Sequence, residues 1–380
     1  MADALLFENA MVVLPHGIVG GWVATAGERI VEVGEGRAPE RGIDFDGDFL
    51  IPGLIELHTD HLENHLTPRP QVRWPTVAAV VAYDAQIAAS GITTVFDSLR
   101  VGEETVTGSH EDELREILEA IAVARAADLL RIDHRLHLRC EICAEDVVES
   151  TQRLLDRHSV GLISLMDHTP GARQFVHLDA WRTYYGGKSG LPKGELDGFM
   201  EKKRTQFASN YTRNRAALVA LAKSRSVVVA SHDDATAEHV RESIADGASV
   251  AEFPTTLEAA TISHGAGIAV LMGAPNVVRG GSHSGNIAAE TLAREGVLDI
   301  LSSDYVPASL LMGGFELARR IEGYGLHAAL NAVSLHPASA TGLLDRGQIA
   351  VGLRADLVRI RVEHDLPVVR GVYRAGKRVF

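Results

Sequence analysis

Short apolar runs alternate with helical periodicity through the middle of this chain. Eight β-like runs can be counted, at residues 54–60, 93–99, 135–142, 161–168, 227–232, 250–253, 268–272 and 298–304. Apolar positions at helical spacing predict helices in the gaps, at residues 77–90, 112–127, 144–157, 210–224, 235–245, 257–264, 287–295 and 317–326. Strands that alternate with helices are typical of βα units and a parallel sheet. Eight such units across about 290 residues predict an α/β fold of the (β/α)8 TIM-barrel type.

An open doubly wound sheet is the alternative architecture for the same pattern. Such sheets often carry a G-x-G-x-x-G loop after the first strand, and none follows residues 54–60. The barrel is therefore the favoured fold class.

The two ends of the chain have a different texture. Residues 4–7, 11–14, 21–26 and 29–33 predict short strands separated by turns, and residues 355–361 and 367–379 alternate apolar with polar positions, which also predicts strands. Neither end can bury a core alone, because domains below about 40 residues usually need additional cross-links. We therefore expect residues 1–50 and 345–380 to form one small β domain, and residues 51–344 to form the barrel.

Composition narrows the possible roles. The chain has 380 residues, of which 46% are hydrophobic and 23% charged, which suits a globular protein with a substantial core. Its formal net charge of −13 argues against a general nucleic-acid or membrane-surface role. The two cysteines, Cys140 and Cys143, exclude a disulfide framework and are interpreted as buried structural residues. Without a basic leader or an apolar run of about 18 residues, the chain is expected to be cytoplasmic.

The stretch from Pro52 to Glu63, P-G-L-I-E-L-H-T-D-H-L-E, begins as an apolar strand and ends in potential metal ligands. Because successive side chains of a strand point to opposite faces, Glu56, His58 and Asp60 share one side. An imidazole and a carboxylate two residues apart can hold one divalent cation. At the carboxyl end of a barrel strand, they would lie where barrels bind their ligands.

Other strand ends carry the same kinds of side chain. Taken singly, a histidine or aspartate at a strand end is better explained as a helix cap or a satisfied polar residue. Five strands that end alike favour a shared metal site instead. Imidazole and carboxylate ligands without thiolate suit Zn²⁺, Mn²⁺ or Fe²⁺, and six of them suffice for two ions. The candidate ligands are His58, Asp60, Glu141, His168, His232 and Asp304.

A pair of such ions can activate water, polarise a substrate and stabilise a leaving oxygen. Asp304, on the last strand, is placed to accept the proton of that water. Asp167, Asp233 and Asp234 are interpreted as helix N-caps, since each precedes a turn or helix. Asp97 is interpreted as a buried hydrogen-bonding residue.

Basic residues follow several of the same strands. The segment 275–286 surrounds Arg279 and His283 with glycines and serines, so that side chains and backbone N–H groups can both approach phosphate oxygens. The long irregular stretch 169–197 is interpreted as a lid. Taken singly, loop arginines are better explained as solvated or ion-paired residues, but together they favour a polyanionic substrate. The candidate phosphate-binding residues are Arg69, Arg139, Arg173, Lys188, Arg279 and His283.

At this point the residues resemble a known family. The motif His58-Thr59-Asp60, a late strand ending in Asp304, and the segment 347–358, G-Q-I-A-V-G-L-R-A-D-L-V, resemble the amidohydrolase superfamily. The resemblance implies a metal-bearing barrel with a small β-sandwich made from both chain ends. Superfamily members usually show H-x-H at the first strand, whereas the second position here is Asp60.

With Asp60 at that position, the chain resembles one branch of the superfamily, which acts in the carbon–phosphorus lyase pathway. The segments that carry this resemblance are 56–63, 167–171, 231–235, 252–256, 273–285 and 302–307. The resemblance implies a metal-dependent diphosphatase of phosphonate catabolism. Its substrate would be α-D-ribose 1-methylphosphonate 5-triphosphate, and its products pyrophosphate and the 5-phosphate. Functional association with other phosphonate-degrading enzymes, and a homo-oligomeric state, are further expectations.

Two other functions remain open on the sequence. The first is hydrolysis of a C–N bond in a cyclic amide, an acetylated amine or an aminated ring, a common chemistry on this fold. The second is a binding or scaffolding subunit without turnover. Assays on amide and triphosphate substrates, and a metal analysis, separate these from the diphosphatase.

Overall fold

The computed structural model describes residues 4–102, 104–105, 108–109, 111–171, 173, 178, 181–182, 193–282 and 285–380. Contacts divide the chain into two compact units. The first comprises Met1–Asp97, Ala120–His134 and Met272–Phe380, and the second comprises Ser98–Glu119 and Arg135–Leu271. Among the described residues, no helix has both the length and the apolar character needed to cross a bilayer.

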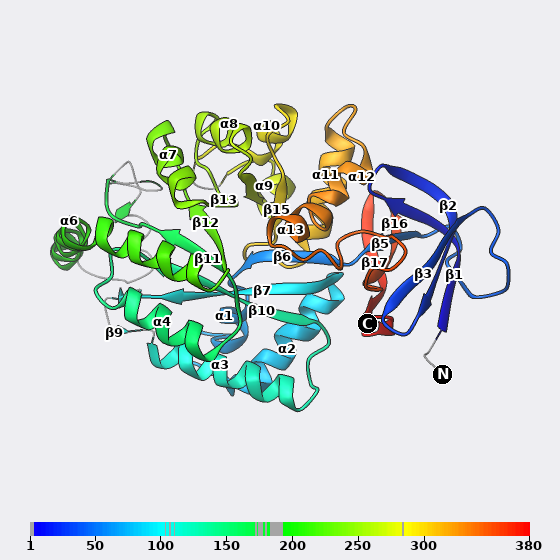
Figure 1. Ribbon diagram of the computed structural model, residues 1–380, viewed down its shortest axis with the longest axis horizontal. Helices are drawn as coiled ribbons and strands as arrows, with labels where there is room; N and C mark the ends of the chain where they lie inside the picture. The colour runs from blue at the N-terminus through cyan, green and yellow to red at the C-terminus, as the bar shows by residue number, and fades with distance from the viewer. Residues whose placement is uncertain are drawn as a thin grey trace. The chain divides into compact units, whose positions relative to one another are not determined.

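The two chain ends build one sheet, within the first unit. Its strands are β1 (Ala4–Leu14), β2 (Gly17–Ala26), β3 (Arg29–Glu35), β4 (Ile43–Asp44), β5 (Phe49–Pro52), β16 (Leu357–Glu363), β17 (Leu366–Arg374) and β18 (Lys377–Arg378). They pair in the order β18-β17-β16-β5-β1-β2-β3, with β4 beside β1 (Figure 1). The antiparallel pair β5–β16 therefore joins the two ends of the chain. The rings of Phe7, Phe45 and Tyr373 pack edge to face in its core.

Eight further strands form a nearly closed parallel barrel. They are β6 (Leu54–Thr59), β7 (Ile92–Val101), β10 (Asp133–Glu141), β11 (Val160–Met166), β12 (Val228–His232), β13 (Val250–Glu252), β14 (Ala269–Gly273) and β15 (Ile300–Ser302). Their order is β15-β14-β13-β12-β11-β10-β7-β6, and a parallel bridge between Thr59 and Asp304 links the last strand back to the first. All eight predicted barrel strands are confirmed. Most of their residues are buried, and the buried set includes polar side chains on β6, β7 and β10.

Helices connect these strands. They are α1 (Leu62–Leu66), α2 (Thr76–Ala89), α3 (Glu111–Ala126), α4 (Val147–Arg157), α6 (Lys193–Ser224), α7 (Ala237–Asp246), α8 (Leu257–Gly265), α9 (Ala274–Arg279), α10 (Ala289–Arg294), α11 (Ser309–Arg320), α12 (Leu326–Asn331) and α13 (Leu335–Ala340). A short hairpin, β8 (Glu104–Thr105) and β9 (Gly108–Ser109), precedes α3.

Two helix predictions need correction. The helix predicted at 210–224 begins at Lys193, so the end of the expected loop 169–197 is helical. The helix predicted at 317–326 instead occupies Ser309–Arg320, and a separate helix begins at Leu326. Gly313 and Gly314 lie within this helix, although glycine usually disfavours a helix interior. A Cβ on Gly313 would lie only 3.0 Å from the Cβ of Ala274, so a larger residue would not fit there. The glycines there permit close helix packing.

Candidate active site

In the first unit, the ends of β6 and β15 are joined by a dense set of hydrogen bonds. The Oγ of Ser302 donates to the carbonyl of His58 at 2.7 Å, and the backbone N–H of Asp304 donates to the same carbonyl at 3.2 Å. The Oγ1 of Thr59 donates to the carbonyl of Asp304 at 2.7 Å. Two predicted site residues, His58 and Asp304, are therefore held beside one another at the point where the barrel closes.

Glu56 lies beneath this seam and is fully buried. One carboxylate oxygen accepts the backbone N–H of His58 at 2.6 Å, and the other accepts the backbone N–H of Ser303. Burial raises the pKa of Glu56 to about 7, although hydrogen bonds from Ser303 and His58 oppose the rise. Glu56 thus connects the strand that carries His58 to the segment that carries Asp304.

Asp304 is half-buried and has a φ of 54°, in the left-handed region that few residues other than glycine, asparagine and aspartate adopt. A Cβ on Gly273 would lie 3.5 Å from its Oδ2, so Gly273 keeps space open beside the carboxylate. Asp60 follows β6 directly and is half-buried. His61 points Nδ1 at the carbonyl of Tyr305, at 2.9 Å.

In the second unit, two histidines each meet a carboxylate through Nδ1. The Nδ1 of His168 lies 2.7 Å from Oε2 of Glu141, and that of His232 lies 3.1 Å from Oε2 of Glu252. The centroids of the two imidazoles are 6.1 Å apart. Metal-bound histidines usually donate their second ring N–H to a carboxylate in this way, which fixes the tautomer. Glu141 therefore orients His168.

Asp233 completes a possible metal-binding group with these histidines. Ligand atoms of His168, His232 and Asp233 all lie within 4.8 Å of one another. Burial raises the pKa of Asp233 to about 7, against the opposing effect of His168 and two arginines. Imidazole and carboxylate donors at this spacing fit a divalent ion such as Zn²⁺.

A second group in this unit, Glu141, Cys143 and Asp167, is also closely spaced. Burial and the neighbouring Asp167 raise the pKa of the Cys143 thiol, which keeps it protonated and makes it a poor metal ligand. Both cysteines are buried and free, as the sequence predicted.

Strand β10 carries buried polar side chains, among them His137 and Arg139. His137 meets the Oγ of Ser164 at 2.8 Å through Nε2 and that of Ser98 at 3.1 Å through Nδ1. Its Nε2 also lies 3.9 Å from Glu252. The electrostatic effect of His137 and the hydrogen bond from His232 lower the pKa of Glu252, although burial opposes them. Glu252 therefore carries charge beside His232.

The capping role predicted for Asp234 is wrong. Thr236 caps α7 by accepting the N–H of His239, whereas Asp234 forms a buried ion pair with Arg173. The second Nη of Arg173 contacts Glu242 at 3.1 Å. Arg173 was predicted to bind phosphate, but its charge is already met by these two carboxylates.

The other candidate phosphate residues differ in their surroundings. Arg69 and Arg279 are exposed in the first unit, and Nη1 of Arg279 lies 3.5 Å from the hydroxyl of Tyr305. Arg139 is buried on β10, in the second unit. Lys188 and His283 lie outside the described residues.

Away from these strand ends, the first unit contains a buried charged cluster around His134. Its Nδ1 lies 2.9 Å from Asp97 and its Nε2 lies 3.3 Å from Asp84. Tyr83 donates to Asp97 at 3.0 Å, and Arg131 pairs with Asp84 at 3.0 Å. Asp97 is thus a buried hydrogen-bonding residue, as predicted.

Glu56, Asp233 and Glu252 were not among the ligands selected from the sequence, and the N-cap role predicted for Asp233 is wrong, because Thr236 caps the following helix. The available signal was the alternation of strand positions, which puts Glu56 on the same face as His58. Position along the chain could have identified the other two, because Asp233 directly follows the end of β12 and Glu252 is the last residue of β13.

Comparison with known proteins agrees with this architecture. A model of the amidohydrolase family matches residues 85–380. The chain is 44% identical over 379 residues to "Alpha-D-ribose 1-methylphosphonate 5-triphosphate diphosphatase" of Escherichia coli strain K12, covering 99% of this chain and 100% of that protein.

Solved structures with lower identity share the fold. N-acetyl-D-glucosamine-6-phosphate deacetylase from Mycobacterium smegmatis superposes with a TM-score of 0.65 at 19% identity, over 99% of this chain and 100% of that one. N-isopropylammelide isopropylaminohydrolase from Burkholderia multivorans superposes with a TM-score of 0.66 at 16% identity, over 99% and 98%. On the family match and the extent of identity to the Escherichia coli protein, this chain belongs to the amidohydrolase family.

Proposed function

We propose that this protein is a metal-dependent hydrolase that releases pyrophosphate from α-D-ribose 1-methylphosphonate 5-triphosphate. The observation that carries the proposal is the 44% identity, over essentially both full lengths, to the Escherichia coli diphosphatase. The anhydride bond that breaks joins the first and second phosphates, because the products are pyrophosphate and the 5-phosphate.

The proposed metal ligands are the six residues selected from the sequence: His58, Asp60, Glu141, His168, His232 and Asp304. The donor chemistry supports one or two divalent ions, because imidazoles and carboxylates predominate at these strand ends. Asp233 is added as a candidate ligand on its spacing from His168 and His232.

A divalent ion bound by these residues would supply Lewis-acid catalysis and ease the ionisation of water. Asp304 is proposed to accept the proton that the attacking water loses. Arg69, Arg139, Arg279, Lys188 and His283 are proposed to neutralise the phosphates. Arg173 is proposed to act differently, by holding Asp234 and with it the segment that follows His232.

Several further features stay predictions. We propose that the terminal sheet is the small β-sandwich of the family, formed by residues 1–50 and 345–380, and that residues 51–344 form the hydrolase barrel. A cytoplasmic location, a homo-oligomeric state and association with other phosphonate-degrading enzymes also remain expectations from the sequence.

The test is a pyrophosphate-release assay on the ribosyl triphosphate, before and after chelation. We expect chelation to abolish turnover, and Zn²⁺, Mn²⁺ or Fe²⁺ to restore it. N-acetyl-D-glucosamine 6-phosphate serves as an amide comparison. Turnover that survives complete metal removal, or faster cleavage of the amide than of the triphosphate, would refute the proposal.

Asp304→Asn tests the proposed base. Asparagine tolerates the left-handed backbone at this position, so the fold is expected to remain while kcat falls about 100- to 10,000-fold. Asp365→Asn is the matched control, because Asp365 is exposed and also has a positive φ, of 64°. Equal activities of the two variants would exclude Asp304 from the chemistry.

A further inference from the structure

Helix α6 is much longer than the barrel requires. It has 32 residues, whereas α4 and α7 have 11 and 10. At about 1.5 Å per residue, α6 is about 48 Å long. It ends at Ser224, shortly before β12 begins at Val228, and so it runs back along the barrel from the carboxyl ends of the strands.

Two asparagines fix the level of α6 against the strand ends. The Nδ2 of Asn210 donates to the carbonyl of Cys143 at 3.0 Å, and that of Asn214 donates to the carbonyls of Ile142 and Ala144 at 3.0 and 2.8 Å. These carbonyls directly follow Glu141, the last residue of β10. The part of α6 that precedes Asn210 therefore extends past the strand ends, on the side where Glu141 and His168 lie.

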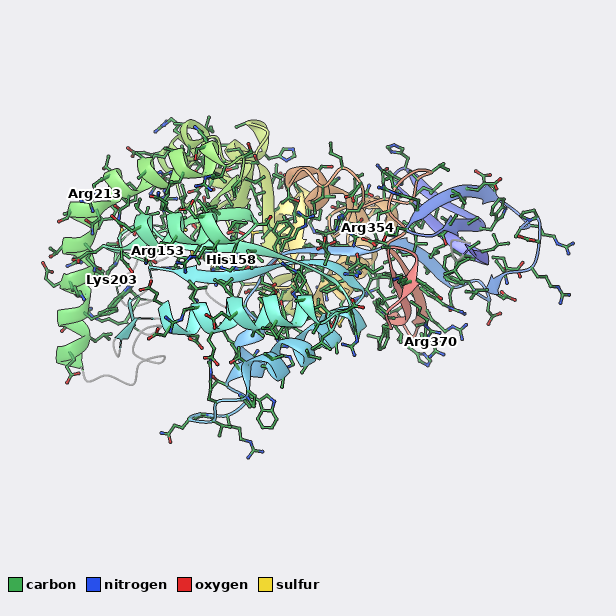
Figure 2. The ribbon with its side chains drawn as sticks, turned by 60° about the horizontal axis from the view of Figure 1, so that its bottom comes forward. Arg153, His158, Lys203, Arg213, Arg354 and Arg370 are labelled. Atoms are coloured by element: carbon green, nitrogen blue, oxygen red, sulfur yellow. The ribbon has the colours of Figure 1, made fainter. Side chains whose placement is uncertain are left out.

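This projecting part carries a buried lysine. Lys203 is only 2% exposed, and it shares one helix face with Gln206, Asn210 and Asn214, since their spacings are three and four residues. Figure 2 labels Lys203 on the N-terminal half of α6 and Arg213 further along the same helix. The neighbouring Lys202 is exposed.

A chain of aromatic contacts connects Lys203 with the histidine of the site. Its ammonium lies 5.5 Å from the ring centroid of Phe199. The Phe199 ring stacks on that of Trp181, with centroids 6.0 Å apart, and the Nε1 of Trp181 donates to the carbonyl of His168 at 3.2 Å. The lysine is thus held near the metal-ligand side of the second unit.

The surroundings of this ammonium favour an anion. Among the described residues, no carboxylate is in ion-pair range of Lys203. The face of an aromatic ring offsets only part of the cost of burying a charge. A buried ammonium normally requires a negative partner, and a polyphosphate provides several.

We propose that Lys203 binds the two outer phosphates of the substrate, which leave as pyrophosphate. This inference rests on the proposed function and adds a phosphate-binding residue to it. Lys203 contributes to this binding from the buried face of α6. It neutralises charge on the leaving group and keeps the polyphosphate aligned beyond the strand ends.

The test compares Lys203→Met with Lys202→Met, which removes the same charge from the exposed neighbouring position. Three quantities are measured: KM and kcat for the triphosphate, and the Kd of inorganic pyrophosphate by calorimetry. We expect K203M to raise both KM and the pyrophosphate Kd about 10-fold or more, with a smaller change in kcat. Lys203→Arg is expected to recover most of the affinity, and K202M to match the wild type.

The outcomes separate the two proposals. If the wild type releases pyrophosphate and a folded K203M keeps its KM and pyrophosphate Kd, the inference about Lys203 is wrong and the proposed function stands. If the wild type shows no turnover but binds pyrophosphate in a manner that K203M abolishes, the function is wrong and the anion site stands. If K203M does not fold, Lys203→Gln takes its place in the same comparison, because it keeps a polar head without the charge.

Discussion

The buried cluster around His134 makes a quantitative prediction about stability and pH. Burial alone would lower the pKa of His134, but Asp97 and Asp84 outweigh it and raise the pKa to about 9, from 6.5. The same contacts lower the pKa of Asp84, despite its burial. Because His134 is buried and directly hydrogen-bonded to both carboxylates, solvent screens these contacts little.

The sign follows from the direction of the shift. Between about pH 6.5 and pH 9 the folded protein holds the proton of His134 and the unfolded chain does not, so stability falls as pH rises. A shift of about 2.5 pKa units, at about 1.4 kcal/mol each, contributes about 3 kcal/mol below pH 6.5. About 2 kcal/mol of this is expected to disappear between pH 7 and pH 9.

Urea unfolding at pH 7, 8 and 9 measures the effect. The variants are His134→Asn, which cannot titrate in this range, and His16→Asn, an exposed control in the same unit. The difference in unfolding free energy between wild type and H134N is expected to shrink by about 2 kcal/mol over this range, while H16N follows the wild type. A difference that stays constant with pH would refute the reasoning, because it would mean that His134 does not change its charge.

Two further predictions concern buried carboxylates near the site. Arg173→Met is expected to lower the free energy of unfolding by about 3–5 kcal/mol, because it leaves Asp234 buried without its cation, and adding Asp234→Asn is expected to restore most of the loss. Urea denaturation of the single and double variants checks this, and simple additivity would contradict the ion pair. Glu56→Gln is expected to cost about 1–3 kcal/mol, because an amide N–H would then face a backbone N–H of His58 or Ser303. Urea denaturation of Glu56→Gln tests this prediction, and a variant as stable as the wild type would show that those hydrogen bonds contribute little to stability.

The sequence predicted the barrel well because its strands depend on a local pattern. Strands such as β11 and β14 are short apolar runs that are buried on both faces, and their composition identifies them. The N-terminal half of α6 was missed for the opposite reason. Its buried face begins with Leu196 and Met200 but continues with Lys203 and Gln206, and a search for apolar periodicity does not detect a face that is partly polar.

The candidate site was predictable in part. Strand ends and residue type sufficed to select His58, His168 and Asp304. The partners of these residues depend on contacts distant in sequence, as with Arg173, whose ion pair with Asp234 spans 61 positions. A loop arginine next to a candidate ligand looks the same in sequence whether it meets a phosphate or a buried carboxylate.

The discontinuity of the first compact unit has a consequence for synthesis. Its last stretch, Met272–Phe380, supplies β15 beside β6 and β16 beside β5. Until that stretch leaves the ribosome, β5 exposes an open edge, and such edges favour pairing with other chains. All residues of the second unit have been synthesised once Leu271 is added, so the second unit can fold before the last stretch of the first unit is made. Truncations near the C-terminus are therefore expected to provoke aggregation, although they remove no residue of the proposed catalytic set.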